Sequence, residues 1–190
     1  MMLPALSRRQ ALLLAAGLAC LPAASAAALP GDSLYRLNPR LTDQDGHAFE
    51  LGSGRGAPVL VSMFYSSCEM VCPVLFETIA QTLKQLPAAS REAVRIVMVS
   101  FDPERDTVAI LKQTADKHGC DPRWSLVRGS AADARQVAAA LGVQYRRLPS
   151  GEFNHSSSVI LLDREGRIVQ RSGSLGSVDA ALVAALRRAA

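Results

Sequence analysis

The most pronounced hydrophobic pattern in the chain is an apolar, β-branched run over residues 59–65, which follows a Gly-Ala-Pro sequence. A run of this kind, bounded by turn-forming residues, predicts a buried strand. Apolar positions at helical spacing come next, over residues 74–86, and predict a helix with one broad buried face. A second apolar run covers residues 94–101. Because a right-handed crossover through a helix joins parallel strands, we expect these two strands to be parallel.

Turn signals and weaker periodic patterns organise the rest of the chain. Asp45-Gly46 lies between short alternating segments and predicts an N-terminal β-hairpin. Further elements are expected as a strand at 124–127, a helix at 133–141 ended by Gly142, a loop at 153–158 entering a buried strand, a hairpin turn at 163–166 and a helix at 177–188. This order predicts an α/β, thioredoxin-like fold, with a central mixed β-sheet flanked by helices, an N-terminal β-hairpin and an insertion.

Two cysteines, Cys68 and Cys72, lie between the first predicted strand and the helix, and Pro73 follows directly. Residues four apart share one face of a helix, with Cβ atoms about 5–6 Å apart. Because proline disfavours helical backbone in the preceding residue, we expect both cysteines on a turn that ends where the helix begins. In either geometry the sulfurs can approach closely enough for a disulfide or for two bonds to one metal ion.

The start of the predicted helix also affects the chemistry of these thiols. Its free N–H groups carry partial positive charge and therefore favour thiolate over thiol. Thiolates are both the nucleophiles and the metal ligands. A structural disulfide, or a pair of buried thiols without a role, is the simpler alternative for this CxxxCP sequence.

The first 28 residues have the pattern of an export signal. A short basic segment precedes an apolar run over residues 11–21, and small residues follow. The pair Arg8-Arg9 in its context resembles a twin-arginine signal, so we expect residues 1–28, with Cys20, to be removed. An ordinary secretory signal, lipidation at Cys20 and an uncleaved anchor are the alternatives.

Residues 29–190 are long enough to form one domain with a sizeable core. The chain has 21 basic and 17 acidic residues, and without the arginines of the predicted signal the balance is 19 against 17. The basic residues form no stripe with interleaved aromatic residues, so nucleic-acid binding is not expected. The sequence has no transmembrane run after the signal, and its pattern requires nothing larger than a monomer.

An acidic segment follows the second predicted strand. Asp102 precedes a proline, and Asp106 and Thr107 come shortly after it. Asp102, or the Asp106-Thr107 pair, is expected to supply the N-cap and the first-turn acids of the next helix.

Three further residues with metal-binding or redox side chains have simpler interpretations. His47 follows the predicted hairpin turn and is expected to face solvent. His118 is expected in the last turn of a helix, where a basic group suits the helix dipole. Cys120 has no evident partner, and a structural or incidental thiol is expected, with an intermolecular disulfide as the alternative.

Three segments, YSSCEMVCP, SFDPERDT and FNHSSSVILLD, occur in this order and resemble the Sco/SenC family of copper-binding, thioredoxin-like proteins. The resemblance runs from about residue 41 to residue 166. It implies that Cys68, Cys72 and His155 are copper ligands and that Asp102 is an acidic residue close to the site. In that family the residue before the histidine is often an aspartate, whereas this chain has Asn154.

The residues support a copper site by their own chemistry. Two thiolates and one imidazole form a soft ligand set suited to Cu(I), and Cu(II) would accept them with an added oxygen or solvent ligand. A closed structural zinc site needs a fourth ligand, and no other cysteine or histidine has a suitable spacing. His155 alone would more often be a core or turn histidine. In a thioredoxin-like fold, however, the loop before this late strand faces the cysteines.

Two functions follow from the resemblance and the thiols. The first is a metallochaperone that delivers copper to the copper centre of a respiratory cytochrome c oxidase. The alternative is a thiol–disulfide oxidoreductase, in which Cys68 attacks and Cys72 resolves, so that the two form a redox-active disulfide. A peroxide-scavenging thiol enzyme is less favoured, because the sequence has no separate peroxidatic cysteine motif.

The predicted export signal implies a location, and the resemblance implies partners. The protein is expected to be exported to the periplasm, or to the periplasmic face of the inner membrane if the N-terminus keeps it there. Its expected partners are the copper-bearing subunit of the oxidase or other exported copper and thiol proteins.

Overall fold

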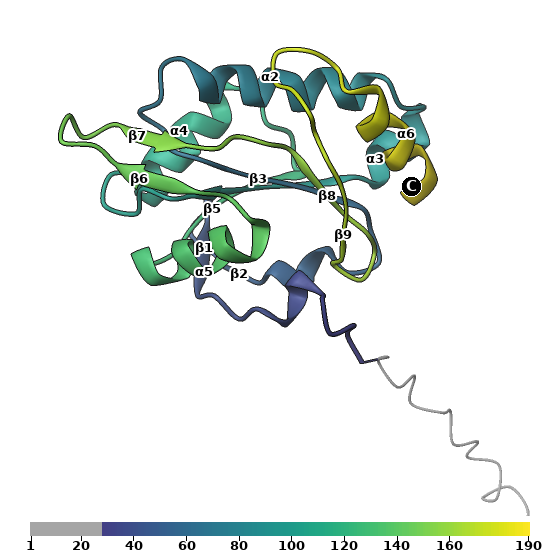
Figure 1. The fold of residues 1–190 in the computed structure, drawn as a ribbon, viewed down its shortest axis with the longest axis horizontal. Coiled ribbons are helices and arrows are strands. Elements are labelled where there is room, and N and C mark those ends of the chain that lie inside the picture. Colours follow the sequence, from purple (N-terminus) through teal and green to yellow (C-terminus); the bar gives the residue numbers. More distant parts are fainter. Residues whose placement is uncertain (1–27) are drawn as a thin grey trace, which may run out of the picture.

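The computed structural model describes residues 28–190 (Figure 1), so Cys20 and residues 1–27 of the predicted signal lie outside the described residues. The strands are β1 (Leu41–Asp43), β2 (Ala48–Phe49), β3 (Val59–Phe64), β4 (Arg95–Ser100), β5 (Trp124–Arg128), β6 (Tyr145–Arg147), β7 (Phe153–His155), β8 (Ile160–Leu162) and β9 (Ile168–Arg171). The helices are α2 (Val71–Lys84), α3 (Ala88–Ala93), α4 (Val108–Lys117), α5 (Ala131–Leu141) and α6 (Ala180–Ala189), with 3-10 helices η1 (Leu34–Arg36) and η2 (Leu51–Gly54).

Seven strands form one mixed sheet in the order β2-β1-β5-β4-β3-β8-β9. β3, β4 and β5 are parallel, as the predicted crossover requires. β8 joins β3 antiparallel, β9 joins β8, and the β1–β2 hairpin closes the other edge through β5. The predicted α/β architecture, with its mixed sheet and N-terminal hairpin, is confirmed.

Helices cover both faces of this sheet. Helices α2, α4 and α6 lie on one face and α5 lies on the other (Figure 1). Every residue of β3 is buried, and β4 exposes only Arg95. Such continuous apolar runs are what strands covered on both faces require. No helix within residues 28–190 is long and apolar enough to cross a membrane.

Helix α2 begins earlier than predicted. It starts at Val71, so Cys72 lies in the first helical turn and not on a turn before the helix. The first N–H groups of a helix have no intrahelical acceptor, and Pro73 at the third position therefore removes no hydrogen bond. The restriction that proline places on its preceding residue is overcome here by the packing of α2.

The cap of α4 also differs from part of the prediction. Thr107 is the N-cap, and its hydroxyl accepts a hydrogen bond from the N–H of Ile110 at 3.3 Å. The Thr107 part of the prediction is confirmed, whereas a capping role for Asp102 or a first-turn role for Asp106 is wrong. Both carboxylates lie before the cap, where other side chains and N–H groups bind them.

The segment around His155 is the largest departure from the predicted pattern. His155 ends strand β7 and pairs with Tyr145 of β6 in a separate two-stranded sheet, so the predicted loop is wrong for residues 153–155. Residues 156–158, which lead to the buried strand β8, form no regular structure, as predicted. The strands have three residues each, too few for a period-two pattern to be recognised. The β6–β7 hairpin extends from the end of the sheet at which α2 begins (Figure 1).

Candidate metal centre

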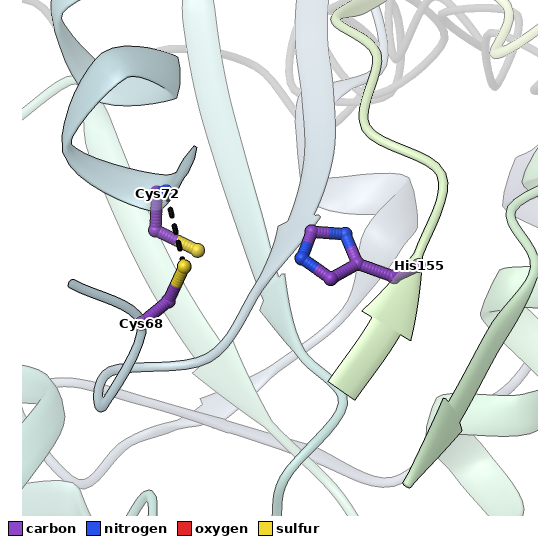
Figure 2. Close-up of side chains that lie close together, drawn as sticks. All are labelled: Cys68, Cys72 and His155. Atoms are coloured by element: carbon purple, nitrogen blue, oxygen red, sulfur yellow. Dashed lines mark hydrogen bonds between the residues drawn. The ribbon is translucent and has the colours of Figure 1, made fainter. Parts of the chain in front are cut away.

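Cys68, Cys72 and His155 each place one ligand atom within 4.8 Å of the others. Within residues 28–190 they are the only group of three histidine, cysteine or acidic side chains with this geometry. Figure 2 shows the cysteines on one side, at the start of α2, and the histidine facing them from β7. Both cysteines are buried and the histidine is half-buried. The three residues that the sequence singled out are therefore brought together by the fold.

The end of β3 is a natural place for such a site. β3 has the parallel strand β4 on one side and the antiparallel strand β8 on the other. The chain that leaves β3 enters α2, while the connection to β8 passes through α5 on the opposite face. Open α/β sheets bind ligands at the carboxyl ends of strands where the direction of the connections changes. We call residues 65–70, which follow β3 here, the cysteine loop.

The two thiols differ in their environments. The backbone N–H of Cys72 donates a hydrogen bond of 3.3 Å to Cys68 Sγ, drawn as a dashed line in Figure 2. Burial would raise the pKa of Cys68, but hydrogen bonds from Cys72 and from the N–H groups of Val71 and Met70 outweigh it and lower this pKa. Burial raises the pKa of Cys72. Both are free thiols. Because the pKa of Cys68 is lowered and that of Cys72 is raised, Cys68 is the more readily ionised of the two.

The ring of His155 is oriented by a serine. The hydroxyl of Ser157 lies 2.9 Å from Nδ1. The opposite edge of the ring, which carries Nε2, points toward the two sulfurs in Figure 2. With the proton on Nδ1 and donated to Ser157, a neutral imidazole keeps its Nε2 lone pair available as a ligand.

Aromatic rings hold the hairpin against the end of the sheet. Phe153 of β7 lies 5.1 Å from Tyr65 and 5.0 Å from Phe101, measured between ring centroids. Tyr145 of β6 stacks on Phe101 at 4.9 Å. The His155 ring meets the same cluster, at 5.1 Å from Phe101. The position of the histidine thus depends on apolar packing that the cysteine motif does not reveal.

Polar contacts join the same elements. Asp102, whose side chain is 2% exposed, forms an ion pair with Arg105. Arg105 also donates a 2.7 Å hydrogen bond to the carbonyl oxygen of Gly151 at the hairpin turn. The Tyr65 hydroxyl donates a 2.6 Å bond to Glu152. Asp102 is therefore not one of the three converging side chains, and it contacts the hairpin through Arg105.

Asp106 links the cysteine loop to the end of β4 through hydrogen bonds. Its fully buried carboxylate accepts hydrogen bonds from the N–H of Ser66 at 3.2 Å, from the Ser66 hydroxyl, and from the Ser100 hydroxyl at 2.5 Å. This role of Asp106 was not predicted from the sequence. One feature of the sequence could have indicated it. Ser66 follows the apolar run of β3 and Ser100 ends that of β4, and the carboxyl ends of parallel strands lie at the same edge of a sheet.

A cavity of about 520 Å³ opens over the site and is lined by Cys68, Met70, Glu152 and His155 among others. The remaining cysteine and histidines within residues 28–190 do not contribute to the metal-binding group. His47 is exposed beside Asp43, and His118 stacks on Phe76 with ring centroids 4.1 Å apart.

The family model described as SCO1/SenC matches residues 33–190. A Bos taurus protein named "Protein SCO2 homolog, mitochondrial" is 32% identical over 133 residues, which cover 66% of this chain and 49% of that protein. The chain therefore spans about half the length of this relative.

Two solved structures with related folds bear on the site. Copper-bound ScoI of Bradyrhizobium japonicum has 29% identity and a TM-score of 0.68, with coverage of 80% of this chain and 97% of that one. BsSco, described as a member of the Sco family of cytochrome c oxidase assembly proteins with a disulfide switch, has 25% identity and a TM-score of 0.66, with coverage of 80% and 91%. The shared fold confirms the thioredoxin-like prediction.

Proposed function

Since the chain belongs to the SCO1/SenC family, we propose that it is a copper metallochaperone. Copper is its cargo, as Cu(I) or Cu(II), bound by Cys68, Cys72 and His155 and delivered to the copper centre of a respiratory cytochrome c oxidase. The observation that carries the proposal is the approach of two sulfurs and one ring nitrogen to within 4.8 Å. Copper in the related ScoI structure supports the choice of metal.

The donor set fits a carrier that must also release its cargo. Two thiolates and one imidazole are soft ligands that suit Cu(I), and they leave a coordination position to an incoming ligand. The cavity beside Cys68 and His155 gives that ligand access. Release then proceeds by ligand exchange. Because Cys72 is protonated at neutral pH, binding displaces its proton and copper affinity rises with pH.

The site is tested by titrating the reduced protein with Cu(I) and Cu(II) beside the His155→Ala variant. We expect one copper per wild-type chain and a thiolate-to-Cu(II) charge-transfer band that the substitution weakens. His47→Ala is the matched control, because that exposed histidine lies apart from the three converging side chains. Unchanged copper affinity in His155→Ala would show that the three-ligand site is wrong.

Delivery needs a separate assay with a recipient. Copper-loaded protein is mixed with the metal-free copper-binding domain of the oxidase subunit, and the metal content of each is measured after separation. We expect copper to move to the recipient. If the carrier binds copper but none moves, the proposed recipient is wrong while the copper site stands.

A second candidate function, thiol–disulfide exchange, is favoured by the two free thiols and the lowered pKa of Cys68. The Cys68 thiolate attacks a partner disulfide, forms a mixed disulfide and releases one partner thiolate. Cys72, after losing its proton, attacks Cys68 Sγ and releases the second. Two electrons pass to the partner, and a Cys68–Cys72 disulfide remains. The disulfide switch described for BsSco supports this candidate.

His155 discriminates between the two functions. A dithiol reductant has no need of the imidazole, so His155→Ala should retain reduction of an oxidised oxidase subunit or another exported protein. A copper carrier should lose affinity in the same variant. The functions are linked, because copper binds the dithiol and not the disulfide.

The acidic residue that the resemblance implies close to the site, Asp102, acts in this proposal through Arg105. We expect Asp102→Asn to weaken the contact of Arg105 with the hairpin turn and to change copper binding or release modestly, with the fold retained. If the Asp102→Asn protein does not fold, the ion pair of Asp102 with Arg105 serves the stability of the fold instead.

We also propose that residues 29–190 are the mature domain, that residues 1–28 direct export, and that the protein acts in the periplasm or at the periplasmic face of the inner membrane as a monomer. Intact mass of the exported protein tests the cleavage. Substituting Arg8 and Arg9 by lysine should block export if the twin-arginine route is used. Membrane association would follow only if the N-terminal segment is retained.

A further inference from the structure

Met70 occupies a position that packing and capping do not explain. Its side chain is 80% exposed, whereas the other exposed large apolar side chains of residues 28–190 are 37–47% exposed. It is the N-cap residue of α2, yet its side chain makes no capping hydrogen bond. Serine, threonine, aspartate and asparagine are the residues preferred at that position.

Met70 is, however, well placed with respect to the metal centre. It lies midway between Cys68 and Cys72 in the sequence, and its backbone N–H hydrogen bonds to Cys68. It lines the same cavity of about 520 Å³ as Cys68 and His155. An exposed thioether therefore stands at the mouth of the site, on the segment that carries both thiols.

The chemistry of a thioether differs from that of the three proposed ligands. It is soft and uncharged, and it favours Cu(I) over Cu(II). It carries no proton to be displaced when a metal binds. The methionine side chain is unbranched with three rotatable bonds, so its sulfur can take up many positions within the cavity that it lines.

We propose that Met70 Sδ is an exchange ligand specific for Cu(I), which holds the ion together with Cys68 and Cys72 when His155 is detached from it. This inference rests on the proposed copper-carrier function. In the exchange one bond from copper to His155 Nε2 breaks and one bond to Met70 Sδ forms. No electron or proton moves, and copper remains Cu(I).

The proposed copper ligands lie on two separate elements of the fold, so one of them can leave the ion while the others stay bound. The three sulfur-bearing residues lie on the cysteine loop and the first turn of α2, whereas His155 lies on the β6–β7 hairpin. Cu(I) can thus be passed to or from a partner at the exposed sulfur while the hairpin ligand is free. Cu(II), which prefers the imidazole, gains nothing from Met70.

The test is a cycle of four proteins: wild type, Met70→Leu, His155→Ala and the double variant. Cu(I) affinity is measured by competition with a chromophoric chelator. We expect Met70→Leu to lower the Cu(I) affinity of the wild-type protein by less than about threefold. In the His155→Ala background the same substitution should lower it by about tenfold or more, which is the loss of metal affinity commonly seen when a group that supports a metal site is removed. Cu(II) affinity should not depend on Met70 in either background. Val74→Ala is the control, since Val74 is an exposed apolar residue of α2 at 40% exposure that does not line the site cavity.

X-ray absorption of selenomethionine protein provides an independent readout. The chain has five methionines, of which Met63 and Met98 are buried, so Met70→Leu identifies any selenium–copper signal. We expect selenium–copper scattering in Cu(I)-loaded His155→Ala and its loss in the double variant. Equal effects of Met70→Leu in both backgrounds, or no scattering in a His155→Ala protein that still binds Cu(I), would overturn the inference alone. A wild-type protein that binds no Cu(I) would overturn the proposed function and this inference together.

Discussion

The carboxylate of Asp106 accepts hydrogen bonds from both the backbone N–H and the hydroxyl of Ser66, although the two residues are 40 positions apart in the sequence. Ser66 lies two residues before Cys68, and Asp106 is fully buried. The Ser100 hydroxyl donates to the same carboxylate. One acidic side chain therefore holds the start of the cysteine loop against the end of β4.

Replacement of Asp106 by alanine should destabilise the protein and loosen the cysteine loop. The donor groups of Ser66 and Ser100 that now bind the carboxylate would be left buried without partners. We therefore expect a loss of roughly 2–4 kcal/mol in the free energy of unfolding. Denaturant titration measures this loss, and copper titration should show weaker binding in the fraction that remains folded. Glu104→Ala is the control, because its exposed ion pair with Arg147 contributes about 0–1 kcal/mol. Equal stability of the two variants would contradict the role given to Asp106.

The same residue predicts a pH dependence. Burial raises the pKa of the Asp106 carboxyl even though hydrogen bonds from Ser100 and Ser66 oppose it. The native state therefore binds this proton more tightly than the unfolded state, where the pKa is about 3.9. Stability from this group is present at low pH and declines as pH rises from about 4 through the raised pKa. The difference in unfolding free energy between wild type and Asp106→Asn should show this decline, and a difference independent of pH would contradict it.

Much of the site could be predicted because its strongest signals are local. The apolar run that forms β3, the CxxxCP sequence and the helix after it are each visible within 28 residues, 59–86. The order of strands and helices then restricts where the chain can return to the sheet. In a thioredoxin-like order the segment before β8 faces the cysteines, and the family resemblance predicted His155 within that segment as the third ligand.

The remainder depends on contacts between distant segments. The pairing of His155 with Tyr145 needs two three-residue strands that leave no period in the sequence. The bond between Asp106 and Ser66 becomes apparent only once β3 and β4 are aligned. For Cys72, the local effect of a following proline predicted a non-helical residue, and tertiary packing of α2 outweighed it.

Ser157→Ala should weaken copper binding without unfolding the protein. The Ser157 hydroxyl, 2.9 Å from Nδ1 of His155, holds the ring so that Nε2 points at the sulfurs. Loss of a group that orients a metal ligand commonly costs about 10–100-fold in affinity, and we expect the lower end because Ser157 bears no charge. Copper titration and the intensity of the Cu(II) charge-transfer band measure the effect. Ser156→Ala, which removes a hydroxyl bonded to Gln144, is the control and should leave both unchanged.

The two site cysteines should react with alkylating agents at different rates. Hydrogen bonds outweigh burial at Cys68 and lower its pKa, whereas burial raises the pKa of Cys72 and raises that of Cys120 to about 12. The thiolate is the reactive form, so at pH 7 iodoacetamide should modify Cys68 first in the reduced protein, by about tenfold or more over the other two. Peptide mass spectrometry over time measures the three rates.

Matched variants separate ionisation of Cys68 from its accessibility. Cys120→Ser should leave the rate at Cys68 unchanged, since these two thiols do not share a site. The rate at Cys68 should rise with pH and level off below the ordinary thiol pKa of about 8.5. A rate that keeps rising beyond that pH would mean that the hydrogen bonds from the start of α2 do not offset burial. In that case the proton on Cys68, and not only that on Cys72, would have to be displaced when copper binds.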